Sequence, residues 1–301
     1  MPSPFPVPDW LKPILVPVWN SAHRYGWLAY DYGNALGRGR IERCIVCGRF
    51  RPMLYRRRVV QRRLEEMWGL TRRLAEALAR KESGDCSHCG AKLRGRRIAS
   101  VLLSLYGVAN PPTPVRTLAR WVEQPEVQAL RVAEINRIDG LHQQFARLPH
   151  FSGSDHDPAS KLDAPGRGIR SEDLTHLSYP DGCFDLVLTS ETLEHVPDLE
   201  AALREIHRVL DSGGRHIFTI PLLPGIPETF ARSIVLPDGT IEDRSPRISH
   251  PGGDWGYPVF TEFGADLPAL FKHAGFKTDV FFGPVRDDDL AQVYVCRKLP
   301  P

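Results

Sequence analysis

Residues 184–214 read FDLVLTSETLEHVPDLEAALREIHRVLDSGG, and this stretch indicates the fold. Phe184 to Leu188 is a short apolar run, typical of a parallel strand that is covered on both faces. Thr189 to His195 then gathers hydroxyl, carboxylate and imidazole groups at the point where the strand ends. In α/β sheets, ligands bind at such strand ends.

A helix is predicted directly after this loop. Pro197 and Asp198 open it, and apolar residues recur at every third or fourth position within 199–210. The glycines at 213–214 are expected to end the helix, and the apolar run 216–220 is expected to form the next strand. The segment is therefore one βα unit of an α/β sheet with its following strand.

This unit resembles the fourth strand, following helix and fifth strand of class I S-adenosylmethionine-dependent methyltransferases, where FDLV, L-E-H-V and R-V-L-x-x-G-G recur. The resemblance covers roughly residues 129–297. It implies a Rossmann-like methyltransferase sheet that binds S-adenosylmethionine.

The resemblance also implies where the methionine part of the cofactor lies. The predicted strand 130–135 carries Glu134 in the acidic position of the family loop E-x-G-x-G-x-G, but the glycine positions hold Asn136, Ile138 and Gly140. Asparagine tolerates a positive φ angle better than most residues, whereas a β-branched isoleucine does not. The loop therefore follows another path or binds the cofactor weakly.

Other positions match the family more simply. Phe151–Asp155 resembles the second strand, which places Asp155 at the ribose hydroxyls and Asp173 at the adenine amino group. Thr189 and Ser190 complete the expected cofactor contacts. Helix capping or turn formation is the alternative role for the two aspartates.

Two histidines are expected on the acceptor side. His195 follows the strand that carries the cofactor loop, and an imidazole titrates near neutrality, so it is the candidate general base. A role in ordering the loop is the alternative. His250 lies in a Gly-rich stretch before the expected helix 261–274, where the family places part of its substrate wall.

The sequence E-x-x-E-H at 191–195 resembles the metal-binding motif of small-RNA 2′-O-methyltransferases and of ubiquinone-type O-methyltransferases. In those proteins a later histidine completes the site. Glu191, Glu194, His195 and His250 would then hold a catalytic divalent cation such as Mn²⁺, Fe²⁺ or Zn²⁺. Because L-E-H-V also occurs in methyltransferases without metal, a metal-free site is the alternative.

Four of the six cysteines form two C-x-x-C-G knuckles. Paired thiolates at this spacing each fill two corners of a tetrahedral zinc site, and four thiolates leave no position open for chemistry. A structural zinc is therefore expected, with two disulfides as the alternative; no secretory signal precedes the knuckles, which favours a reducing cytoplasm and metal. The expected ligands are Cys44, Cys47, Cys86 and Cys89.

The region around the knuckles is strongly basic. Residues 41–100 carry 16 Lys and Arg against 6 Asp and Glu, whereas the whole chain has a net charge of +3. Two helices are predicted between the knuckles, broken at Gly69, with Thr71 capping the second. The module resembles the zinc-ribbon region of bacterial methyltransferases found with polysaccharide and natural-product genes. The basic charge of the module would bind RNA through its phosphates. The alternative is that the charged residues form a helix face that is exposed to solvent.

The 301 residues divide by pattern into an arm (1–40), a zinc-binding helical module (41–110) and a Rossmann-like methyltransferase domain (111–301). The arm is expected to pack on the core, swap between subunits of an oligomer, or touch a membrane surface. No apolar run approaches the ~20 residues that span a bilayer.

Three functions remain open from the sequence. The first is O-methylation of a small molecule or glycan-type acceptor in the cytoplasm. The second is RNA methylation with the basic module as the RNA-binding part. The third follows from the altered glycine loop: a methyltransferase-like protein that binds a ligand without the cofactor, or that catalyses another reaction.

Overall fold

The computed structural model describes residues 29, 33, 40–56, 59–60, 62–107, 114–156, 170–222, 225–250, 257–283 and 290–299. The predicted arm lies almost wholly outside these residues. So do residues 157–169, which separate the strand at Asp155 from the segment that leads to Asp173.

A seven-stranded sheet forms the centre of the protein, in the order β15-β16-β8-β7-β4-β5-β6. Strands β4, β5, β6, β7 and β8 pair in parallel, and β16 runs antiparallel to both of its neighbours. The expected Rossmann-like α/β fold is therefore confirmed. The strands are β4 (Val132–Ile135), β5 (Phe151–Asp155), β6 (Arg170–Ser171), β7 (Phe184–Ser190), β8 (Leu210–Thr219), β15 (Phe276–Phe281) and β16 (Val293–Lys298).

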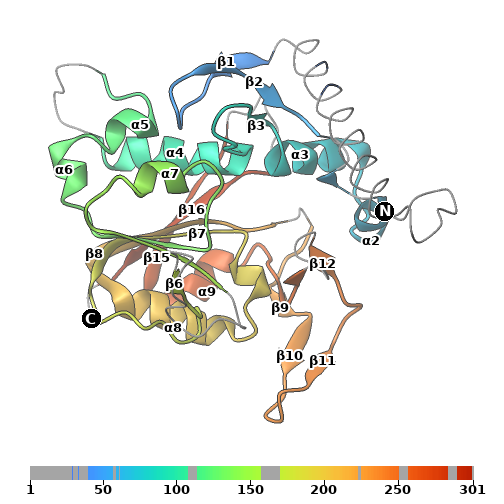
Figure 1. The fold of residues 1–301 in the computed structure, drawn as a ribbon. Coiled ribbons are helices and arrows are strands. Elements are labelled where there is room, and N and C mark those ends of the chain that lie inside the picture. The colour runs from blue at the N-terminus through green and yellow to red at the C-terminus, as the bar shows by residue number, and fades with distance from the viewer. Residues whose placement is uncertain are drawn as a thin grey trace, which may run out of the picture.

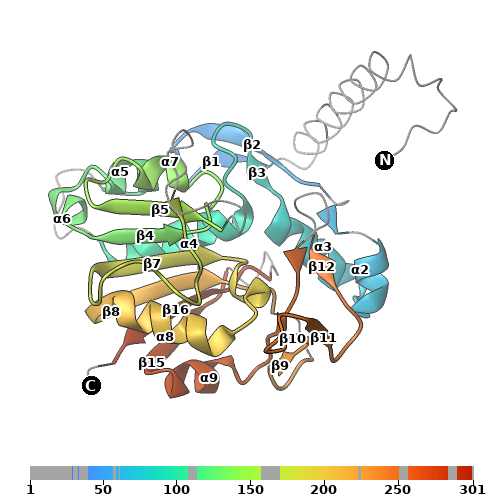
Figure 2. The same ribbon diagram turned by 60° about the horizontal axis from the view of Figure 1, so that its bottom comes forward.

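Helices cover both faces of this sheet (Figures 1 and 2). On one face lie α4 (Leu93–Leu105), α5 (Leu118–Trp121) and α7 (His142–Phe145), with α6 (Pro125–Gln128) at the edge. On the other face lie α8 (Leu199–Val209) and α9 (Leu267–His273). Each helix layer shares a hydrophobic core with the strands beneath it, so the central strands β4, β7 and β16 are buried along most of their length.

The βα unit at 184–214 forms as predicted at its start and differs at its end. Asp198 caps α8 by accepting a hydrogen bond from the Ala201 amide at 2.8 Å. The helix ends at Val209, however, and not at the glycines 213–214. Leu210 is already extended and fully buried, and it pairs with Phe184, so β8 begins there and bulges before the register resumes.

The expected helix 261–274 was also too long at its start. Thr261–Glu262 forms β14, which pairs with β9 (Phe230–Ala231). The buried Glu262 carboxylate accepts a hydrogen bond from Arg232 at 2.8 Å, which ties this segment to the wall before it. The helix α9 then begins at Leu267, with a proline in its first turn. The intervening wall contains β10 (Ser233–Val235), β11 (Ile241–Asp243), β12 (Ser249–His250) and β13 (Tyr257–Pro258).

The amino-terminal module contains a small sheet as well as helices. Strands β1 (Ile41–Arg43), β2 (Phe50–Leu54) and β3 (Asp85–Cys86) pair in this order, and the sequence patterns did not predict them. The two helices α2 (Arg62–Met67) and α3 (Arg72–Glu82) are separated near Gly69, which has φ of 57°, and Thr71 caps α3 as expected. Both helix predictions are confirmed.

The module and the large sheet share one hydrophobic core. Helix α4 contributes Ile98 and Leu102, the sheet contributes Leu186 and Val295, and the first knuckle contributes Val46. All of these side chains are 6% exposed or less. The module is therefore built into the side of the sheet. Within the described ranges, no helix is both long enough and apolar enough to cross a membrane.

Candidate active site and four-cysteine centre

The loop after β4 is organised by a buried carboxylate. Glu134 is 0% exposed; its Oε1 accepts a hydrogen bond from the Ile138 amide at 3.1 Å, and its Oε2 lies 2.5 Å from His142 Nδ1. Burial raises the pKa of Glu134, and the contact with His142 opposes that rise. Asn136 has φ of 62°, so it takes the left-handed conformation that glycine provides in the family loop.

Gly140 faces the cysteine module. It has φ of 74°, and a Cβ atom placed on it would lie 2.7 Å from the Cβ and amide nitrogen of Ala91, directly after the second knuckle. Any side chain here would therefore collide with the knuckle. This close approach is by itself enough to explain why residue 140 is a glycine. The predicted contact of Gly140 with the cofactor stays a prediction.

The two predicted nucleoside-binding aspartates have local partners. Asp155, at the end of β5, accepts hydrogen bonds from the backbone amide of Arg137 at 3.0 Å and from its Nε at 2.7 Å. Asp173 accepts from the amide and hydroxyl of Thr175, both at 2.8 Å, which is an Asx turn. Asp155 thus lies at the carboxyl edge of the sheet, as a ribose ligand must, while Asp173 forms a turn.

Thr189 and Ser190 end β7 and differ in burial. The hydroxyl of Thr189 is buried and lies 2.9 Å from His216 Nε2, so it points into the sheet core. Ser190 Oγ lies 2.8 Å from Thr219 Oγ1 and accepts a hydrogen bond from Arg94 Nε at 3.1 Å. Ser190 is therefore the one of the two that borders the carboxyl-end site.

Three of the four predicted acceptor-side residues converge. The ligand atoms of Glu194, His195 and His250 all lie within 4.8 Å of one another. His195 Nε2 is 3.5 Å and His250 Nδ1 is 3.7 Å from Glu194 Oε1, and the two imidazole rings are 4.9 Å apart at 89°. The turn η3 (Leu193–His195) supplies the first two residues and β12 the third.

Hydrogen bonding fixes the orientation of His195. Its Nδ1 lies 2.8 Å from the carbonyl oxygen of Pro258, and because a carbonyl only accepts, Nδ1 carries the proton. Nε2 of the neutral ring is then an unprotonated nitrogen directed at Glu194. The Trp68 ring packs edge-on against His250, so the module also borders this cluster.

Burial controls protonation in the cluster. Glu194 is 0% exposed and neither carboxylate oxygen has a hydrogen-bond partner among the described residues, so burial, reinforced by the charge of Glu191, raises its pKa well above the ordinary value. Burial lowers the pKa of His195, and it lowers that of His250 to about 3. Both rings are therefore neutral at neutral pH, which suits a base or a metal ligand.

Glu191 stands apart from this cluster. Its Oε2 lies 2.7 Å from Lys81 Nζ, and its backbone has φ of 51°. Burial would raise the pKa of Glu191, but the positive charges of Lys81 and Arg94 outweigh burial and lower it. Lys81, Glu82 and Arg94 come from the cysteine module, and their place at the ends of β7 and β8 was missed from the sequence.

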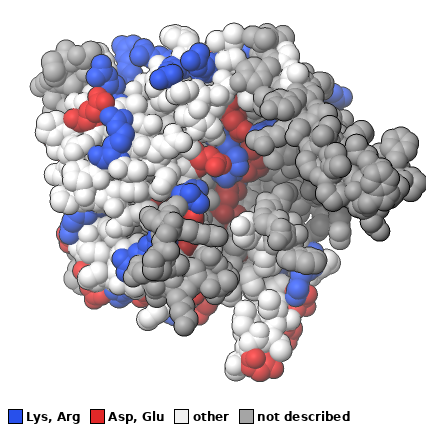
Figure 3. Space-filling view, in the orientation of Figure 1, with Lys and Arg blue, Asp and Glu red and all other residues white. Residues whose placement is uncertain are grey.

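The sequence held one signal for Lys81. It continues the stripe of buried residues on α3 that includes Ala77 and Leu78, so its position predicts burial although its charge does not. Figure 3 shows acidic and basic side chains set back in a hollow near the middle of the face drawn there. The carboxyl-end site is thus lined by charges from both parts of the protein.

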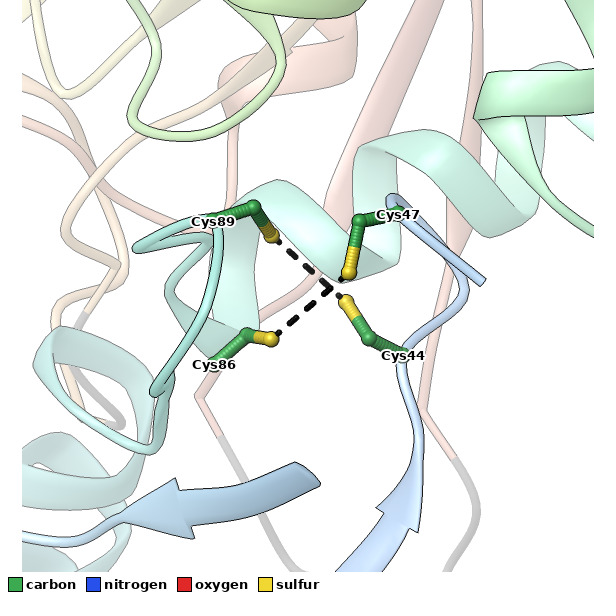
Figure 4. A group of neighbouring side chains, drawn as sticks. All are labelled: Cys44, Cys47, Cys86 and Cys89. Atoms are coloured by element: carbon green, nitrogen blue, oxygen red, sulfur yellow. Dashed lines mark hydrogen bonds between the residues drawn. The ribbon is translucent and has the colours of Figure 1, made fainter. Parts of the chain in front are cut away.

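The four knuckle cysteines meet at one point. Figure 4 shows their side chains directed toward one another from two separate turns. Cys44 Sγ lies 3.8 Å from Cys89 Sγ, and Cys47 Sγ lies 3.8 Å from Cys86 Sγ. All four sulfurs fall within 4.8 Å of one another. A disulfide would require about 2.05 Å, so the four thiols are free.

This geometry suits a tetrahedral metal. Corners of a tetrahedron with metal–sulfur bonds of about 2.3 Å lie about 3.8 Å apart, which equals the two sulfur distances above. Hydrogen bonds from the Cys44 and Cys89 thiols lower the pKa of Cys86, and the pKa of Cys44 is raised to about 11 chiefly by its bond to Cys86.

Comparison with known proteins identifies part of the chain. Residues 148–218 match the family described as "Methyltransferase domain". This stretch runs from just before β5 to the end of β8 and includes the turn with Glu194 and His195. This part of the chain is therefore similar to methyltransferase domains.

Individual relatives match over different lengths. The chain is 54% identical over 44 residues to a sarcosine/dimethylglycine N-methyltransferase of Halorhodospira halochloris, covering 15% of this chain and 16% of that protein. It is 29% identical over 167 residues to a ubiquinone biosynthesis O-methyltransferase of Pseudomonas syringae, covering 52% and 68%. An S-adenosylmethionine-dependent methyltransferase structure from Mesorhizobium loti aligns with a TM-score of 0.38 and 20% identity, covering 60% and 98%.

Proposed function

We propose that this protein uses S-adenosylmethionine to methylate an oxygen atom of a small-molecule or glycan-type acceptor. The observation that carries the proposal is His195: its Nδ1 proton is bound by Pro258, which leaves Nε2 free at the carboxyl end of β7. The Pseudomonas relative is an O-methyltransferase, and this supports oxygen as the acceptor atom.

The residues after β4 and β5 fit the cofactor. Asn136 supplies the positive φ angle at the first altered glycine position, and Asp155 offers a carboxylate at the edge where parallel strands end. When bound, S-adenosylmethionine supplies a methyl group on a positively charged sulfur. Within this chain, Glu134 fixes the loop, Asp155 would bind the ribose, and His195 would take the proton from the acceptor hydroxyl.

A divalent cation at Glu194, His195 and His250 is the alternative form of this proposal, in which His195 Nε2 would bind the cation and would not take the proton. Ligands at about 2.1 Å from one cation lie about 3.0 to 3.4 Å apart, close to the 3.5 and 3.7 Å of the contacts with Glu194 Oε1. The unpartnered Glu194 carboxylate and the hydrogen bond that orients His195 are features of metal sites. Such a cation would hold the acceptor oxygen and lower its pKa.

The cation is tested without an activity assay. Mn²⁺ binding, followed by electron paramagnetic resonance, should be saturable in the wild type and lost in Glu194→Gln, which keeps the side-chain shape. Glu200→Gln, at an exposed position in the first turn of α8, is the control. Equal Mn²⁺ affinity in wild type and Glu194→Gln would remove the cation from the proposal and leave His195 as a metal-free base.

We propose a structural zinc at the four cysteines. The sulfur distances and the absence of a bonded sulfur pair support it, and four thiolates leave no position for a substrate. The division into residues 1–40, 41–110 and 111–301 also stays a proposal. Helix α4, in the second part, shares a hydrophobic core with the sheet of the third part, so these two parts pack against each other.

The cofactor is tested by calorimetry with S-adenosylhomocysteine. Wild-type protein should bind it, and Asp155→Ala should weaken binding by roughly 1 to 3 kcal/mol, the cost of leaving buried polar groups unpaired. Asp238→Ala, in an exposed turn far along the chain, is the control. No binding at millimolar ligand would overturn the proposed reaction and favour a protein that has lost the cofactor.

RNA as the acceptor is the second candidate, favoured by one surface. On β1 and β2, Ile41 and Phe50 are 51% and 68% exposed beside the exposed Arg43 and Arg51. An exposed aromatic ring among arginines can stack on a base. RNA affinity that falls steeply with salt and is weakened by Phe50→Ala would support this acceptor; weak binding that Phe50→Ala leaves unchanged would exclude it.

A further inference from the structure

Charged side chains of the cysteine module reach the ends of two central strands. Lys81 is 1% exposed, and its ammonium group donates to Glu191 Oε2 at 2.7 Å, at the end of β7, and to the carbonyl oxygen of Ile220 at 2.9 Å, just past β8. Arg94 Nε donates to Ser190 Oγ at 3.1 Å, and its guanidinium group pairs with Glu82. Two adjacent residues of the sheet, 190 and 191, are thus both held by the module.

The residue that Lys81 holds has an unfavourable backbone. Glu191 has φ of 51°, a left-handed conformation that residues other than glycine rarely adopt. Its amide donates to the Thr219 carbonyl at 2.9 Å, so the chain turns sharply at this point. The turn directly precedes Leu193–His195, so the conformation of Glu191 sets the direction from which Glu194 and His195 enter the site.

The second cysteine knuckle lies between the two holding residues. Lys81 is near the carboxyl end of α3, Cys86 and Cys89 follow, and Arg94 is in the first turn of α4. The Leu93 amide donates to the Ser83 carbonyl at 3.2 Å, which closes this segment into a loop around the knuckle. Lys81, the second knuckle and Arg94 therefore belong to one short, closed segment of the chain.

We propose that Lys81 is a positioning residue for the turn that carries Glu194 and His195, and that the four-cysteine centre, by fixing Lys81 and Arg94, is part of the reaction site. The evidence for this inference is the Lys81–Glu191 contact. Its relevance to a reaction rests on the proposed function. The low pKa of Glu191 agrees with an ion pair that persists at neutral pH. The module then acts as a wall of the site in addition to any role in binding RNA.

The test reads the state of the His195 ring by nitrogen NMR of histidine-labelled protein, with His195→Gln used to assign its signal. Wild type should show a neutral ring protonated on Nδ1. Lys81→Met should abolish the single tautomer of His195, while Lys81→Arg, which keeps the charge, should restore it. Arg72→Met, on the exposed side of the same helix, is the matched control.

Two further variants distinguish a positioning role of Lys81 from a simple loss of folding. If Lys81→Met does not fold, Glu191→Gln removes the same ion pair without a buried cavity and should change His195 in the same way. The double variant should change it no more than either single variant, because the two residues act as one unit. An unchanged His195 signal in folded Lys81→Met or in Glu191→Gln would overturn the inference.

The cysteine centre has its own arm. Cys47→Ser, which removes one sulfur of this centre and no side chain of the Glu194–His195–His250 cluster, should alter the His195 signal as Lys81→Met does; an unchanged signal in folded Cys47→Ser protein that has lost its zinc would overturn the link to the centre. Binding of S-adenosylhomocysteine is measured separately. A wild type that binds none fails the proposed function, whereas the His195 signals report the Lys81 contact in either case.

Discussion

His195 Nδ1 donates a hydrogen bond to the Pro258 carbonyl oxygen at 2.8 Å, and this contact joins the turn after β7 to the wall formed by β12 and β13. It sets which nitrogen of the ring carries the proton. It also places Nε2 and the His250 ring on the same side of the buried Glu194 carboxylate. The chemistry expected at this site follows from that single tautomer.

Replacing His195 by alanine should abolish methyl transfer and leave cofactor affinity within about twofold, because the ring would act on the acceptor proton and not on the nucleoside. Turnover is measured as S-adenosylhomocysteine released with an acceptor that the wild type methylates, and affinity by calorimetry. His150→Ala, at an exposed position, is the control and should behave as wild type. Full activity in His195→Ala would reduce the residue to a role in ordering its loop.

Purified protein should contain about one zinc per chain, since four thiolates complete one tetrahedral site. Cys86→Ser should lose that zinc or become insoluble, because one corner of the site is missing. Cys183→Ser provides the matched control, since Cys183 lies outside the cluster and should keep the metal. The measurement is elemental analysis after gel filtration. A metal-free wild type with an intact fold would contradict the prediction.

Replacing Gly140 by alanine should destabilise the protein by about 3 kcal/mol, because the new methyl group meets Ala91 as well as an unfavourable backbone conformation. Gly239→Ala separates the two effects. Gly239 also has a positive φ angle, 82°, but its Cβ would meet nothing within 4 Å, so only about 1 kcal/mol is expected there. Denaturant unfolding measures both. Equal losses in the two variants would show that the contact with Ala91 is unimportant.

His216 should make the protein sensitive to acid. Burial lowers its pKa from the ordinary value near 6.5 to about 3, so between these two values the unfolded chain takes up a proton that the folded chain does not. The free energy of unfolding therefore falls as the pH falls through this window. His216→Gln should lose less of it than the wild type between pH 7 and pH 5, whereas the exposed His273→Gln should follow the wild type. Parallel curves for His216→Gln and wild type would contradict this assignment.

The parts of the fold that were predicted correctly carry local signals. The apolar run at 184–188 and the apolar stripe in 199–210 can be recognised without information about distant residues. The spacing of the cysteines in the two knuckles likewise predicts a shared site. The prediction for the end of α8 was wrong because Leu210 pairs with Phe184 in the sheet. This pairing is a tertiary contact that the local pattern does not show. The hairpin of β10 and β11 was not predicted, although Asp238 followed by Gly239 at its turn is a typical hairpin signal.

In the candidate site, too, the residues with a local sequence signal were predicted and the tertiary contact was not. Glu194, His195 and His250 were identified as a group because E-x-x-E-H and a later histidine form a known pattern, and the structure brings these three together. Glu191 belonged to the same pattern but faces Lys81 instead. No periodicity could reveal that partner, since 110 residues separate the two and the contact depends on how α3 packs against the sheet.

The shared core of α4 and the sheet has a consequence for synthesis on the ribosome. Helix α4 emerges early, but the strand β16 that covers part of its apolar face with Val293 and Val295 is made much later. An unfinished chain therefore presents an uncovered apolar helix, the kind of surface that chaperones bind and that aggregates. All four cysteines are present once Cys89 has emerged, so a metal bound at the proposed centre would be able to hold the start of α4 in place while the rest of the chain is translated.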